Sequence, residues 1–109
     1  MPTHSIVVAQ EFSETPAGRF VTDGPYSGEV FRETLLYPSL QKFDLVEVDL
    51  DGTLGCGSSF LDEAFGGLVR EKHMTVGELK RKLQIKTRRR FYEARIWQYI
   101  SAQESIQAG

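Results

Sequence analysis

The segment Leu45–Leu68 constrains the fold more than any other part of the chain, because a strand pattern passes through glycines directly into a helix pattern. Its first residues, LVEVDL, alternate apolar and acidic side chains and predict a strand, which we expect to be central. The connection DGTLGCG predicts a turn. In SSFLDEAFGGL the apolar residues recur at helical spacing, and Ser58 or Ser59 is the expected N-cap, with Asp62 completing an approximate capping box.

The remaining segments continue this alternation of strands and helices. Further strands are expected at Ser5–Phe12, Arg19–Val21 and Leu83–Thr87, and further helices at residues 28–43, 77–83 and 91–103. Ser27 is the expected N-cap of the first of these helices, which Pro38 should end or bend. Thr75 and Glu78 predict a capping box for the second.

These elements predict an α/β fold, because strands that alternate with helices form crossover units around a largely parallel sheet. We expect one compact domain over residues 1–109, with a mostly parallel or mixed sheet of about four strands packed by three to four helices. Its core should span about residues 5–100. Residues 101–109 are expected as a frayed tail.

Composition narrows the class of protein. The chain has 109 residues, of which 40% are hydrophobic and 26% charged, as in a soluble globular domain. The single Cys56 excludes an internal disulfide and a multi-cysteine zinc site. Because there is also no long apolar run and no secretory signal, we expect a reduced, cytoplasmic protein with no membrane contact and no cofactor. His4 and His73 show no ligand spacing, so no metal is expected.

The stretch Asp49–Leu54, DLDGTL, resembles the first motif of haloacid-dehalogenase-type phosphatases. That resemblance implies Asp49 as nucleophile and Asp51 as acid/base, with magnesium between them. Such enzymes also need a later Ser or Thr, a phosphate-binding Lys and a second acidic pair. None of the acids after Asp51 forms a pair at the end of a later strand. We therefore expect the two aspartates to close a strand at a turn, and the phosphatase stays an alternative.

A longer resemblance covers Arg19 to about Leu83. The blocks GRFVTDGPYSGEVFRETLL and FDLVEVDLDGTLGCGSSFLDEAFGGLVRE resemble the bacterial STAS-like domains of unknown function, which are related to the STAS domains of anti-sigma factor antagonists. This resemblance implies a compact STAS-like α/β domain. It also implies a non-catalytic regulatory role in which the domain binds another protein.

Anti-sigma factor antagonists carry the loop Asp-Ser-Ser-Gly-Leu before a helix, and a histidine-kinase-like ATPase binds them and phosphorylates a serine there. The matching positions are Gly57 to Leu61, with Gly57 in place of the acid and Phe60 in place of the glycine. The resemblance thus implies such an ATPase as partner. The candidate partner-binding or phosphoacceptor residues are Gly57, Ser58, Ser59, Phe60, Asp62 and Glu63.

Two alternatives stay open at these positions. The serines either only cap the helix or also accept a phosphate, which Asp62 and Glu63 are expected to repel. Phe60 is either an exposed anchor for a partner or packed beneath the preceding loop. Farther along the helix, Gly66 and Gly67 predict close approach to a neighbouring element.

The basic run Lys86–Arg90, KTRRR, is followed by Phe91 and Tyr92. Basic and aromatic residues together are typical of nucleic-acid-binding surfaces, so a nucleic-acid-binding regulator is a second alternative. Docking onto an acidic partner is another use for the same run. Cys56 has no neighbouring base in the sequence and is expected to be an inert thiol.

Overall fold

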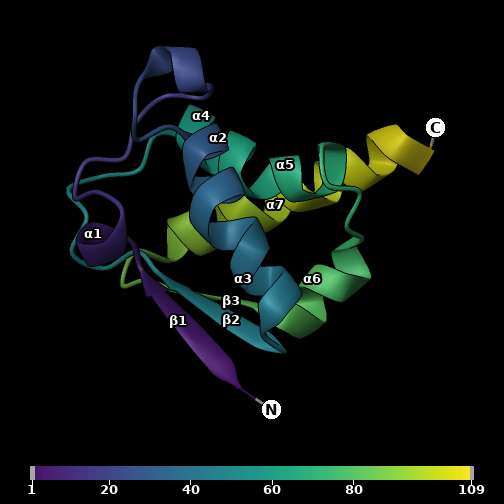
Figure 1. The fold of residues 1–109 in the computed structure, drawn as a ribbon. Helices are drawn as coiled ribbons and strands as arrows, with labels where there is room; N and C mark the ends of the chain where they lie inside the picture. The colour runs from purple at the N-terminus through teal and green to yellow at the C-terminus, as the bar shows by residue number, and fades with distance from the viewer. Residues whose placement is uncertain (1, 109) are drawn as a thin grey trace.

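The computed structural model describes the backbone of residues 2–108 and the side chains of residues 2–104. Its centre is a parallel sheet with the strand order β1 (Thr3–Val7), β2 (Leu45–Asp49) and β3 (Leu83–Lys86). The α/β class and the central position of β2 are therefore confirmed (Figure 1). The expected number of about four strands is wrong for the described residues, which form three.

The helices pack on one face of this sheet (Figure 1). Val48 lies between Ile6 and Ile85 in the register, and this apolar row faces the core. The row on the opposite face joins Ser5, Glu47 and Gln84, and the Ser5 hydroxyl donates a hydrogen bond to Glu47. The alternation of apolar and polar residues in each strand thus separates a buried face from a polar one.

The first long helix consists of three segments, α2 (Gly28–Phe31), the π-helical η2 (Arg32–Leu36) and α3 (Tyr37–Lys42). Ser27 is its N-cap as predicted, and its hydroxyl accepts a hydrogen bond from the Val30 amide at 3.2 Å. Pro38 does not end the helix, which continues to Lys42. Pro38 has no N–H to donate, and its ring clashes with the carbonyl of the preceding turn. The π-helical turn lies at this place, where the regular hydrogen-bond ladder is disturbed.

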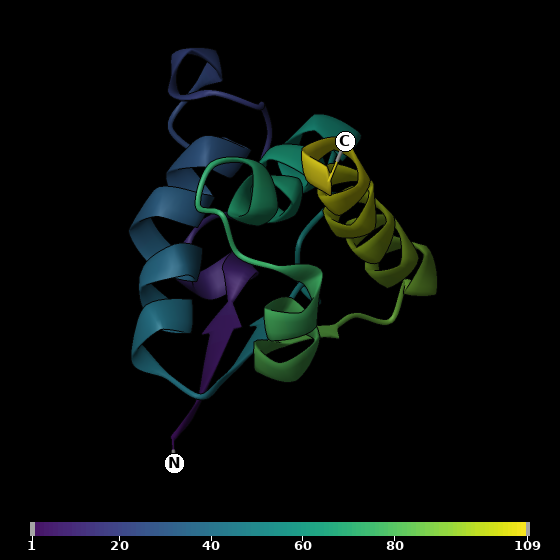
Figure 2. The ribbon, with the colours of Figure 1, turned by 90° about the vertical axis from the view of Figure 1, so that its right-hand side faces the viewer.

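The second long helix has the same construction, with α4 (Ser58–Leu61), the π-helical η3 (Asp62–Gly66) and α5 (Gly67–Arg70). It is followed by α6 (Val76–Lys82), where the predicted capping box of Thr75 and Glu78 is present. The last helix, α7 (Arg90–Ala108), packs along η3 and α5 (Figure 2). Residues 101–108, expected as a frayed tail, continue this helix, and residue 109 lies outside the described residues.

One expected strand ends earlier than predicted and another is absent, and local carboxylates explain both differences. The first strand ends at Val7, whose amide donates to the Glu11 carboxylate at 2.7 Å, and the chain turns into the short helix α1 (Val8–Glu11). Residues 19–21 do not form a strand. The Asp23 carboxylate accepts hydrogen bonds from the amides of Arg19 and Phe20, and the 3-10 turn η1 (Val21–Asp23) forms there.

Candidate functional site

The loop after β2, residues 50–57, leads from the carboxyl edge of the sheet to the start of α4. A second loop, residues 13–27, lies against it, since the Leu54 amide donates to the Glu14 carbonyl at 2.7 Å. Leu54 itself is 74% exposed. The segment Gly57–Glu63, predicted from the sequence, therefore begins at a surface formed by two loops. The exposed apolar side chain of Leu54 belongs to this surface.

The start of α4 differs from the prediction in its capping. Gly57 is the N-cap and has extended backbone angles, and no side chain caps this helix. The predicted capping role of Ser58 and Ser59 and the capping box with Asp62 are therefore wrong, because both serines already lie inside the first turn. Both are exposed, and neither hydroxyl has a hydrogen bond within the part of the chain that the structure describes.

Phe60 lies in the core. Its exposed fraction is 0%, and its ring centroid lies 5.7 Å from that of Phe31 and 6.2 Å from that of Phe12. Of the two interpretations of Phe60, the packed one is confirmed and the exposed anchor is wrong. Gly28 lets α2 approach the backbone of α4 closely, because a Cβ there would lie 2.5 Å from the Phe60 carbonyl oxygen.

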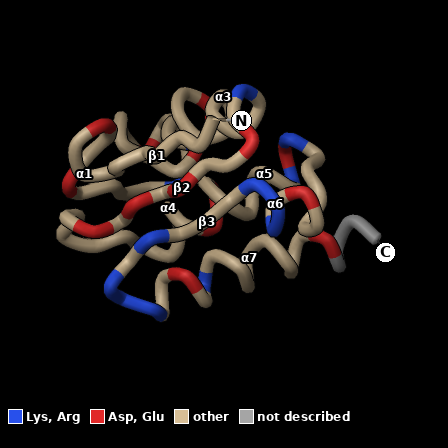
Figure 3. The backbone as a smooth tube through the Cα atoms, turned by 90° about the horizontal axis from the view of Figure 1, so that it is seen from below, with Lys and Arg blue, Asp and Glu red and all other residues tan. Residues whose placement is uncertain are grey.

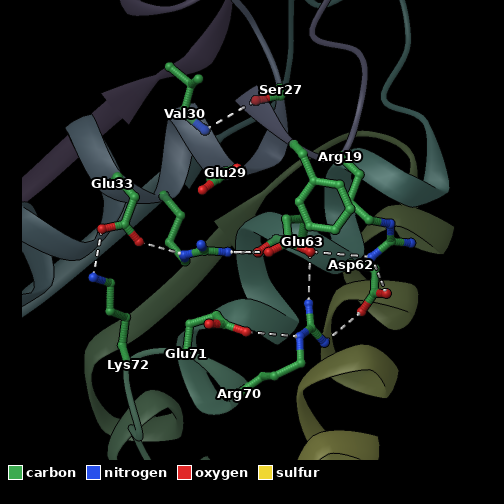
Figure 4. Close-up of polar contacts among 12 residues, drawn as sticks. Arg19, Ser27, Glu29, Val30, Glu33, Asp62, Glu63, Arg70, Glu71 and Lys72 are labelled. Atoms are coloured by element: carbon green, nitrogen blue, oxygen red, sulfur yellow. Dashed lines mark hydrogen bonds and ion pairs between the residues drawn. The ribbon is translucent and has the colours of Figure 1, made fainter. Parts of the chain in front are cut away.

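Asp62 and Glu63 belong to a group of charged side chains at the two π-helical turns, which we call the π-turn ion cluster (Figure 4). The Arg32 guanidinium donates to the Glu63 carboxylate at 2.8 Å, and the side chains of both residues are 5% exposed or less. Around this buried pair lie the other members, which are Arg19, Glu33, Asp62, Arg70, Glu71 and Lys72.

The cluster raises the pKa of two of its arginines. Burial lowers the pKa of Arg32, but hydrogen bonds to Glu63 and Glu33 outweigh burial, so its pKa is raised and it stays charged. The hydrogen bond to Asp62 raises the pKa of Arg19. Both carboxylates of the predicted site are thus paired with arginines. The repulsion expected between these carboxylates and a phosphate on Ser58 is correspondingly reduced.

The three arginines that hold this site were not predicted as site residues. Arg19 and Arg70 both contact Asp62 and Glu63, from the second loop and from α5 respectively. The one available signal was Arg32, a charged residue between the apolar positions of a predicted helix. The predicted close approach at Gly67 is confirmed, because a Cβ there would collide with the Arg32 guanidinium.

Asp49 and Asp51 take part in turn hydrogen bonds. One oxygen of Asp49 accepts from the Asp51 amide at 2.9 Å, and the other lies 3.7 Å from Lys86 Nζ. The Asp51 carboxylate accepts from the Arg88 amide at 2.8 Å, which ties the loops after β2 and β3 together. The residues that the structure describes contain no group of three or more His, Cys, Asp or Glu side chains that could hold a metal ion.

Cys56 is a buried residue of the loop after β2. Its amide donates to the Tyr92 hydroxyl at 3.1 Å, which fixes the loop against α7. Burial raises the pKa of the Cys56 thiol, although the hydrogen bond between the thiol and the Thr53 hydroxyl and the charge of Arg89 oppose the shift. The thiol is therefore protonated at neutral pH, as expected of an inert cysteine.

The basic run lies at the end of β3 and in the turn before α7 (Figure 3). Arg88 and Arg89 border a pocket between this turn and the loop after β2, and Arg90 begins α7. None of the helices in the described residues is long and apolar enough to cross a membrane.

The comparisons with known proteins assign the chain to a family. The family described as STAS-like domain of unknown function (DUF4325) matches residues 27–87, which is more than half of the chain. The matched region contains both π-helical turns, the loop after β2 and the exposed serines. No curated protein and no solved structure matches the chain. The chain therefore belongs to the family of STAS-like domains of unknown function.

Proposed function

We propose that this domain is a non-catalytic regulator that binds another protein through residues 54–59, which we call the docking loop. The observation that carries this proposal is that Leu54, Ser58 and Ser59 are exposed in one short segment, and that the two serine hydroxyls form no hydrogen bond to the other described residues. Phe60 and Glu63 are too buried to contact a partner directly. Their role is to hold the docking loop against the core.

The partner we propose is a histidine-kinase-like ATPase that phosphorylates Ser58 or Ser59 and then dissociates. Membership of a STAS-like family supports a regulatory role, and the resemblance to anti-sigma factor antagonists supports this partner. Ser58 lies four residues before Asp62, which places the two side chains on one side of the helix. A phosphate on Ser58 would compete with Asp62 for Arg19, whose side chain is 32% exposed. We expect residues 13–27 to shift with Arg19.

The test uses the purified chain with such an ATPase, and it has two measurements. Incubation with ATP and mass spectrometry should place one phosphate on Ser58 or Ser59. Changing the modified serine to alanine should abolish the phosphate, whereas Ser101→Ala, at an exposed serine on α7, should leave it in place. A phosphate at another residue, or none, would remove the switch from the proposal.

Binding is measured with the same proteins by calorimetry. Ser59→Glu and Leu54→Asp should each weaken the complex by more than about tenfold, as expected of a central interface residue, whereas Ser101→Glu should not. Unchanged affinity in both docking-loop variants would exclude this surface. Magnesium-dependent hydrolysis of a chromogenic phosphate ester that is lost in Asp49→Asn would instead support the phosphatase alternative.

A further inference from the structure

A pocket at the carboxyl edge of the sheet is lined by residues that do not belong to the docking loop. Its volume is about 310 Å³, at the lower end of the range of small-molecule sites, roughly 300–1,000 Å³. Residues 50–53 after β2, residues 87–89 after β3 and Tyr92 of α7 line it. In parallel α/β sheets, ligands bind outside the carboxyl ends of the strands. Position and size both fit a small ligand.

The positive charges of two lining residues favour an anionic ligand. Arg88 and Arg89 both line it, and neither forms an ion pair within the described part of the chain. Arg89 is held in place by Tyr92, because its Nη1 donates to the Tyr92 hydroxyl at 3.4 Å and its Cζ lies 6.0 Å from the ring centroid. Two guanidinium groups without a carboxylate partner suit the bidentate binding of a phosphate.

One acidic residue, Asp51, lines the same pocket. Its carboxylate accepts a hydrogen bond from the Arg88 amide at 2.8 Å, which offsets part of its charge. A carboxylate has several acceptor positions, so Asp51 can also accept from a hydroxyl group. A ligand that satisfies all three side chains therefore carries an anionic group at one end and a hydroxyl at the other.

We propose that the pocket binds a small phosphate monoester with free hydroxyl groups, the chemistry of a sugar phosphate. Arg88 and Arg89 bind the phosphate, and Asp51 accepts from a hydroxyl. A phosphate monoester carries nearly two negative charges at neutral pH, which matches the two guanidinium groups. At roughly 30 Å³ per water, the pocket holds about ten water molecules, so a phosphate with a short polyol fits and a polymer does not.

Calorimetry with ribose 5-phosphate, inorganic phosphate and ribose tests this proposal. Ribose 5-phosphate should bind more tightly than inorganic phosphate, and ribose should not bind. Arg88→Gln and Arg89→Gln should each weaken ribose 5-phosphate binding by about tenfold or more, the effect of losing a charged hydrogen bond. Arg90→Gln makes the same charge change at an equally exposed arginine and should alter affinity by less than about twofold, because Arg90 does not line the pocket.

Asp51→Asn gives a prediction of the opposite sign. Removing its negative charge should tighten the binding of inorganic phosphate, since the amide oxygen can still accept from the Arg88 amide. Should Arg89→Gln fail to fold, Arg88→Gln keeps the test valid, because the Arg88 side chain makes no hydrogen bond or ion pair to the other described residues. No binding of ribose 5-phosphate to the wild type would overturn the proposal.

A single-stranded oligonucleotide separates this site from a nucleic-acid surface. Tighter binding of the oligonucleotide than of ribose 5-phosphate, lost equally in the glutamine variants of Arg88, Arg89 and Arg90, would overturn the proposal in favour of a diffuse basic surface. Binding confined to the monoester, with no effect of Arg90→Gln, would support the pocket. These outcomes are independent of any partner at the docking loop, because none of residues 54–59 lines the pocket.

Discussion

At the scale of single residues, Gly67 shows how a missing side chain lets two helices meet. A Cβ at this position would collide with Arg32 Nη1 and lie 3.0 Å from Arg32 Cζ. Arg32 has no room to yield, because Glu63 holds it in the interior. We expect Gly67→Ala to lower the free energy of unfolding by about 1–3 kcal/mol, the usual effect of overpacking, although alanine is the better helix former.

Gly77, in α6, is the matched control for this substitution. A Cβ there would meet only Arg81 Nη1 at 3.8 Å and Thr75 Oγ1 at 3.9 Å, which are ordinary contacts. Gly77→Ala should therefore raise the free energy of unfolding by up to about 1 kcal/mol. Urea unfolding of both variants measures the difference. Equal effects at the two glycines would show that Arg32 does not restrict Gly67.

Also at this scale, the N-caps that were predicted correctly from the sequence have partners within four positions. The caps at Ser27 and Thr75 needed only local hydrogen bonds, so their patterns were sufficient. The burial of Phe60 depends on rings from α2 and from the loop after α1, and the pairing of Glu63 depends on Arg32. Contacts between residues so far apart in the sequence cannot be predicted from the spacing of neighbouring residues.

At the scale of the elements, the two π-helical turns carry the ion cluster that joins the long helices. Arg32 begins η2, and Glu63 is the second residue of η3. The sequence predicted both helices because apolar periodicity continues through them. It could not predict the extra residue in each turn. Pro38 was expected to end or bend the first of these helices, which continues to Lys42.

Adjacent carboxylates in η3 allow a controlled test of this cluster. Glu63 is 5% exposed and holds the buried Arg32, whereas Asp62 is 23% exposed and contacts two arginines that also reach Glu63. We expect Glu63→Gln to destabilise the fold by about 3–5 kcal/mol, because it leaves a buried guanidinium without its main partner. Asp62→Asn should change stability by about 0–1 kcal/mol.

Chemical unfolding of the two variants, monitored by circular dichroism, checks the order of their effects. Arg32→Met alone leaves Glu63 with Arg19 and Arg70 as partners. It should therefore be less harmful than Glu63→Gln. An equal or larger effect of Asp62→Asn would contradict the assignment of Glu63 as the centre of the cluster.

At the scale of the whole molecule, the parallel sheet has helices on one face and polar side chains on the other. Parallel sheets are usually covered on both faces. Here the central row of the open face consists of polar residues, Ser5, Glu47 and Gln84. Leaving this row exposed to solvent therefore loses little hydrophobic burial. The alternation of apolar and polar residues along the strands suits this arrangement. The expected number of strands was too high. Arg19–Val21 was expected to be a strand, but the amides of Arg19 and Phe20 donate to the Asp23 carboxylate instead.

The ion cluster also makes the stability of the whole domain depend on pH. Burial raises the pKa of Glu33, but hydrogen bonds from Lys72 at 2.6 Å and Arg32 at 2.8 Å outweigh it, so the pKa is lowered. A lowered carboxyl pKa stabilises the folded state at pH values above the ordinary carboxyl pKa of about 4.3. This contribution is lost as the pH falls through the folded pKa, because the protonated carboxyl no longer attracts the two cations.

We therefore expect the free energy of unfolding to fall on acidification from neutral pH to about pH 3, and to fall less in Glu33→Gln than in the wild type. Glu93→Gln is the control, since Glu93 is exposed on α7 and forms no ion pair among the described residues. Urea unfolding at several pH values compares the three proteins. Because Asp23 also has a lowered pKa and is unchanged in all three, Glu33→Gln should retain part of the dependence. Parallel curves for Glu33→Gln and the wild type would show that the pair with Lys72 and Arg32 does not stabilise the fold.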